Sequence, residues 1–114
     1  MNFLKQNWPI LALVFWFGYK WWSAKQVVSM LPALREIGAI FVDVRSEAEF
    51  STVNAPGTIN IPLQELKSRA GELPKDRDIV VCCASGSRSG IAKLILKSQR
   101  FENVHNVGTW KNLV

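Results

Sequence analysis

One short segment of the chain carries residue types that suit covalent chemistry. Cys83 follows an apolar run, from Ile79 to Cys82, and precedes a loop of small residues that ends at Arg88. Gly86 and its small neighbours let the backbone turn tightly, so that successive N–H groups converge on one point and stabilise an anion. The positive end of a following helix and the guanidinium of Arg88 strengthen that field. The pattern therefore predicts that Cys83 is a thiolate nucleophile.

The surrounding pattern predicts an α/β fold with a small, open, mostly parallel sheet flanked by helices. Four apolar runs are typical of strands: 39–44, 59–61, 79–82 and 103–107. Helical patterns alternate with them: 24–31, with Ser23 as its N-cap, 47–50, 63–70 and 89–97. In such a sheet, sites form at the carboxyl ends of the strands, which is where Cys83 lies.

The N-terminal fifth of the chain differs in composition from the rest. Of the 114 residues, 12 are aromatic, and eight of those lie at or before Trp22. Four basic and no acidic residues precede Glu36, whereas ten basic and nine acidic residues follow from there. The net charge of +5 thus belongs mainly to the N-terminal segment, which argues against a nucleic-acid-binding domain. An apolar content of 48% excludes a disordered chain, and two Cys exclude a disulfide scaffold.

An apolar helix over residues 1–22 is predicted to anchor a domain that spans residues 23–114. The uncharged run between Lys5 and Lys20 would span about 21 Å as a helix, and residues 3–22 would span about 30 Å with interfacial Trp and Lys side chains. The bias of Lys and Arg predicts a single membrane pass with the domain on the cytoplasmic side. An interfacial or docked helix and a cleaved signal peptide are the alternatives.

Five stretches of the domain form a pattern that is more specific than the loop alone: 41–45, 49–50, 55–62, 83–89 and 106–110. By their order and spacing, residues 23–113 resemble a single-domain rhodanese, a sulfurtransferase domain. The sequence departs from that family at Val53 and Asn54, where Gly-His is usual, so we expect the local turn to be built differently.

The resemblance implies an enzyme that moves a sulfane sulfur from thiosulfate or a similar donor to cyanide or a thiol. Cys83 would hold the sulfur as a persulfide. The outer sulfur would be cradled by the backbone N–H groups of five loop residues: Ala84, Ser85, Gly86, Ser87 and Arg88. Because the loop has no basic residue between Cys83 and Arg88, the resemblance implies modest activity with thiosulfate or a different physiological donor.

The remaining residues of the pattern are expected to act in support. Arg88 would orient the anionic group of the donor or brace the loop, and Asp43, Arg45 and Ser89 would be structural or lie behind the site. No cofactor is expected, and no metal site, because one His and two adjacent Cys lack the spacing of metal ligands. No protein partner can be named from the sequence.

Two other functions are compatible with the same residues. Counted from Cys82, the segment has the Cys-x5-Arg spacing of cysteine phosphatases, which would make Cys82 the nucleophile. A membrane-tethered binding or regulatory module without turnover is the second alternative, although interaction domains of this fold commonly lack the Cys.

Overall fold

The computed structural model describes the backbone of residues 3–114 and the side chains of residues 6–19 and 21–114. The helices are α1 (Phe3–Glu36), α2 (Glu47–Thr52), α3 (Leu63–Arg69) and α4 (Ser87–Ser98), with short 3-10 turns η1 (Ala70–Glu72) and η2 (Trp110–Leu113). The strands are β1 (Ile40–Asp43), β2 (Thr58–Asn60), β3 (Ile79–Cys83) and β4 (Val104–Thr109). The predicted alternation of strands and helices is confirmed.

The four strands form one parallel sheet in the order β2-β1-β3-β4. The two central strands are the longest apolar runs of the domain, and all five residues of β3 are buried. Both faces of the sheet are covered, as is usual for parallel strands. All the strands point the same way, so their carboxyl ends meet at one edge, where Asp43 and Cys83 end β1 and β3.

Side chains of β3 alternate between two separate apolar clusters, one on each face of the sheet. Ile79, Val81 and Cys83 pack with residues of α3 and α4 on one face. Val80 and Cys82 pack on the other face, against the C-terminal half of α1. The period of two along a strand therefore sends the adjacent cysteines to opposite faces of the sheet.

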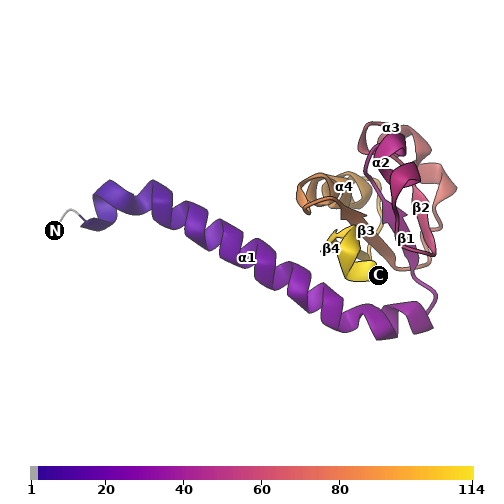
Figure 1. Cartoon of the computed structure of the whole chain (residues 1–114), viewed down its shortest axis with the longest axis horizontal. Coiled ribbons are helices and arrows are strands. Elements are labelled where there is room, and N and C mark those ends of the chain that lie inside the picture. Colours follow the sequence, from indigo (N-terminus) through magenta and orange to yellow (C-terminus); the bar gives the residue numbers. More distant parts are fainter. Residues whose placement is uncertain (1–2) are drawn as a thin grey trace.

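Helix α1 continues without a break from Phe3 to Glu36. Its C-terminal half covers the sheet through Val27, Leu31 and Leu34, which are buried. Its N-terminal half projects beyond the domain, away from the C-terminus of the chain (Figure 1). Ser23, predicted to cap a new helix, lies inside α1, because the residues on both sides of it favour helix and no breaker separates them.

The prediction of a single-pass membrane anchor over residues 3–22, with the domain on the cytoplasmic side, is wrong. Across residues 3–114, no helix combines the length and the apolar character that crossing a bilayer requires. The helix itself is long enough, but its uncharged stretch is bounded by Lys5 and Lys20 and begins with Gln6 and Asn7. The side chain of Lys20, expected to reach the headgroups, lies outside the described residues.

Candidate active site

Cys83 is the last residue of β3 and lies directly before the tight turn that starts α4. The turn depends on Gly86, the residue before the helix, which has φ +100°. A Cβ at this position would lie 3.3 Å from Gly108 Cα on the neighbouring strand. Backbone conformation and close packing thus both require glycine here. The predicted curl of the loop is confirmed.

The sulfur of Cys83 sits inside this turn and is fully buried. The backbone N–H of Gly86 donates to Sγ at 2.8 Å, and Ser89 Oγ lies 3.4 Å from Sγ. Backbone N–H groups of Ser85 and Ser89 also interact with the sulfur. The loop residues thus close over Sγ.

The two cysteines have opposite electrostatic surroundings. Burial by itself would raise the pKa of Cys83, but hydrogen bonds from the Ser89 hydroxyl and from the N–H groups of Ser89, Ser85 and Gly86 lower its pKa below the ordinary value. Burial raises the pKa of Cys82 well above the usual range, and the negative charge of Asp43 raises it further. Cys83 is therefore the cysteine that the structure favours as a thiolate.

Asn106 connects α4 to β4 behind the sulfur, a role that the sequence analysis did not assign. Ser89 Oγ donates to Asn106 Oδ1 at 2.7 Å, and the same oxygen accepts the N–H of Gly108 at 2.9 Å. Its amide nitrogen lies 3.3 Å from the carbonyl oxygen of Gly86. A bulge at Val107 shifts the strand register immediately after Asn106. The sequence feature that could have indicated this role is a polar residue, Asn106, within the predicted strand 103–107.

Arg88 is held by Glu49 of α2. Its two terminal nitrogens lie 2.6 and 3.0 Å from the two carboxylate oxygens of Glu49. The same carboxylate accepts the N–H and the hydroxyl of Ser46, the residue that caps α2. The hydrogen bonds from Arg88 and Ser46 lower the pKa of Glu49 to about 2. The ion pair therefore ties the start of α4 to the start of α2.

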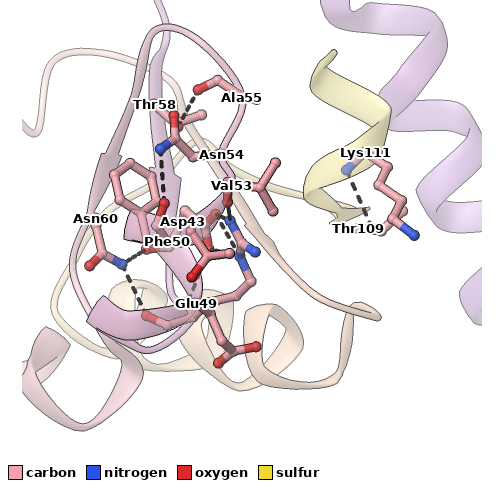
Figure 2. Close-up of polar contacts among 12 residues, drawn as sticks. Asp43, Glu49, Phe50, Val53, Asn54, Ala55, Thr58, Asn60, Thr109 and Lys111 are labelled. Carbon is pink, nitrogen blue, oxygen red and sulfur yellow. Dashed lines mark hydrogen bonds and ion pairs between the residues drawn. The ribbon is translucent and has the colours of Figure 1, made fainter.

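Asp43 and Arg45 form a buried ion pair at the end of β1, where Arg45 Nη2 lies 2.8 Å from Asp43 Oδ2. Arg45 also donates to the carbonyl oxygen of Val53 at 2.7 Å, and its guanidinium stacks over the ring of Trp110. The amide of Asn60 donates to the carbonyl oxygens of both Asp43 and Arg45 (Figure 2). This network fixes the segment that leads to α2 and Glu49.

The turn after α2 is built on the two residues that depart from the rhodanese pattern. Val53 supplies the carbonyl oxygen that Arg45 binds. Asn54 Nδ2 donates to the carbonyl oxygen of Phe50 at 2.8 Å and so completes the end of the helix (Figure 2). The turn is thus held by the side chain of Asn54 and the backbone of Val53, and the ion pair of Arg45 is intact.

Comparison with known proteins agrees with this geometry. A family model described as "Rhodanese-like domain" matches residues 18–112. This chain belongs to the rhodanese family. A solved structure described as "rhodanese with anions from E. coli" superimposes on 68% of this chain and 93% of its own, with a TM-score of 0.63 and 34% identity.

Several relatives of this rhodanese domain carry names that refer to sulfur transfer. It is 39% identical to the thiosulfate sulfurtransferase PspE of Escherichia coli over 75 residues, and this alignment covers 64% of this chain and 72% of PspE. It is 37% identical over 68 residues to a sulfurtransferase of Allochromatium vinosum, covering 60% of this chain and 64% of that protein. A putative sulfur carrier protein of Bacillus subtilis, YrkF, is 41% identical over 66 residues, 58% of this chain but only 36% of YrkF. These relatives support a rhodanese-type enzyme.

Proposed function

We propose that this protein is a sulfurtransferase that carries a sulfane sulfur on Cys83. The observation that carries the proposal is the convergence of backbone N–H groups on one sulfur at the carboxyl end of β3, where the N–H of Gly86 lies 2.8 Å from Cys83 Sγ and Ser89 Oγ lies 3.4 Å away. Donors in this arrangement stabilise a thiolate before reaction and a terminal persulfide sulfur after it. Membership of the rhodanese family and relatives named as thiosulfate sulfurtransferases support the same reaction.

In the first half-reaction the thiolate of Cys83 attacks the outer sulfur of thiosulfate. A sulfur–sulfur bond forms on the protein, the bond inside thiosulfate breaks, and its electron pair leaves with sulfite. In the second half-reaction cyanide or a thiolate attacks the outer sulfur of the persulfide. Thiocyanate or a new persulfide departs, and Cys83 is again a thiolate. Neither step needs an external oxidant or reductant.

The remaining residues of the loop act as supports in this proposal. Residues 84–88 supply the backbone that surrounds the transferred sulfur, with Ser85 and Gly86 nearest to Sγ. Arg88 braces the loop rather than binding the donor, because Glu49 already engages both of its terminal nitrogens. Asp43 and Arg45 hold the neighbouring segment. The catalytic unit is proposed to span residues 23–114.

Cys82 is a poor candidate for the nucleophile of a phosphatase. It is fully buried on the opposite face of the sheet, against α1, and its pKa is raised. Although Cys82 and Arg88 have the Cys-x5-Arg spacing, the side chain of Cys82 points away from the loop that precedes Arg88, so the two residues do not belong to one anion-binding loop.

The decisive experiment is intact-mass spectrometry after treatment with thiosulfate. We expect the wild-type chain and Cys82→Ala to gain the mass of one sulfur atom and to release it to cyanide. Cys83→Ser is expected to gain none while remaining folded. Labelling of Cys83→Ser, or loss of labelling in folded Cys82→Ala, would overturn the assignment of the nucleophile. A folded wild-type chain that takes sulfur from no donor would favour the module without turnover.

A further inference from the structure

A groove of about 820 Å³ lies between the projecting part of α1 and the Cys83 loop. One wall is formed by Trp16, Phe17, Trp21 and Lys25 of α1. The facing wall includes residues 85–87 of the loop and parts of β4 and η2. The groove has the size of a small-molecule site.

The groove is continuous with the reactive centre. Gly86 lines the groove, and its N–H group lies 2.8 Å from Cys83 Sγ. Gly86 alone therefore separates a molecule bound in the groove from the sulfur of Cys83.

The α1 wall is aromatic and open to solvent. Trp16, Phe17 and Trp21 are 51%, 62% and 65% exposed, whereas Val27, Leu31 and Leu34 further along α1 are buried on the sheet. Large aromatic side chains that remain exposed beside a pocket bind flat, apolar groups by stacking and by burial of apolar area.

The charge of the groove is positive. Among the described residues that line it, Lys25 is the charged one, and its Nζ lies 4.4 Å from the centre of the Trp21 ring. Arg88 is occupied by Glu49 and leaves the loop without an unpaired cation of its own. An anionic group next to an aromatic group would thus find Lys25 and Trp21 side by side.

We propose that this groove binds the organic part of the sulfur donor, and that the preferred donor is an anion with an aromatic body, such as an aryl thiosulfonate. This inference rests on the proposed function of Cys83. The thiolate of Cys83 attacks the outer sulfur of the thiosulfonate, the new sulfur–sulfur bond forms on the protein, and the bond to the sulfonyl sulfur breaks. Its electron pair leaves with the aryl sulfinate, so atoms and charge balance.

The kinetic test uses the full chain and two donors, benzenethiosulfonate and methanethiosulfonate, with cyanide as acceptor. Trp21→Ala is expected to reduce the ratio of kcat/KM for the aryl over the methyl donor by about five- to tenfold, the size of an aromatic contact together with its lost buried area. Comparing the ratio between variants cancels the intrinsic reactivities of the donors. Trp22→Ala is the matched control, because Trp22 is similarly exposed on α1 but does not line the groove.

A binding test separates this inference from the proposed reaction. Folded Cys83→Ser, which transfers no sulfur, is titrated with benzenesulfonate and followed by tryptophan fluorescence. We expect saturable binding that Lys25→Gln weakens and that neutral benzenesulfonamide does not reproduce. An unchanged donor ratio in Trp21→Ala, or the absence of saturable binding, would overturn the groove proposal even if Cys83 forms a persulfide. Failure of persulfide formation alone would overturn the proposed function.

Discussion

Removing the Ser89 hydroxyl should make Cys83 harder to ionise. Ser89 Oγ lies 3.4 Å from Cys83 Sγ and 2.7 Å from Asn106 Oδ1, yet it has a single proton to donate. With a neutral thiol, that proton lies toward Asn106 and the thiol donates to the hydroxyl oxygen. With a thiolate, the proton turns toward the sulfur, and Asn106 Oδ1 retains the N–H of Gly108. The hydroxyl thus follows the protonation state of Cys83.

The size of the effect follows from this exchange. A hydrogen bond to a charged group contributes about 1.5–3 kcal/mol, and one between neutral groups about 0.5–1.5 kcal/mol. On ionisation the Ser89 hydroxyl gains the bond to the charged sulfur and gives up its neutral bond to Asn106 together with the weak bond from the thiol, so Ser89 favours ionisation by about 1 kcal/mol. Ser89→Ala should therefore lower the thiolate fraction of Cys83 about fivefold at any pH well below the titration midpoint of this thiol, and it should shift that midpoint to higher pH.

The assay is the pH dependence of alkylation by iodoacetamide in a Cys82→Ala background, which leaves one thiol. Ser89→Thr is expected to restore much of the wild-type profile, because it returns the hydroxyl. Ser98→Ala, at the other end of α4, is the control for a lost serine, since its hydroxyl bonds to the carbonyl oxygen of Ile95 far from the site. A folded Ser89→Ala protein with an unshifted profile would refute the role given to the hydroxyl.

Two further predictions concern the supports of the loop. Glu49→Gln should lower the urea midpoint above about pH 4.5; because the pKa of Glu49 is lowered to about 2, this difference should disappear as the pH falls toward 2, and a difference that persists at pH 2 would contradict this account. Gly86→Ala should reduce the free energy of unfolding by about 1–2 kcal/mol from its positive φ alone, and by more through the contact with Gly108. Gly57→Ala is the control, with φ +82° but open space around it; equal losses in both variants would contradict the packing argument.

Much of the fold could be predicted because its signals are local. The runs 39–44 and 79–82 are too apolar for a strand with a solvated face, so both had to be buried strands of a covered sheet. The tight turn at Gly86 needs a residue without a Cβ, and the small residues around Cys83 allow N–H groups to converge. Fold class, loop and candidate nucleophile could therefore be derived from residue types and spacing.

The error at the N-terminus has an equally local cause. Aromatic residues are indeed concentrated at the N-terminus. Crossing a membrane, however, requires a helix that is both long enough and apolar enough. Lys5, Lys20 and the polar residues next to them shorten the apolar stretch and lower its mean hydropathy. The aromatic side chains instead form one wall of a groove beside the active loop, a placement that depends on how α1 crosses β4.

The sequence by itself determined which residue types meet at the carboxyl edge of the sheet and that Cys83 is the candidate nucleophile. Tertiary structure alone decided which side chains act on it. Arg88 was expected to orient the donor or to brace the loop, and only the fold shows that Glu49, 39 residues earlier in the chain, takes up its guanidinium. Asn106 reaches Ser89 from a strand that becomes a neighbour only when β4 pairs with β3. Such partners are set by packing over long sequence separations, which residue spacing does not encode.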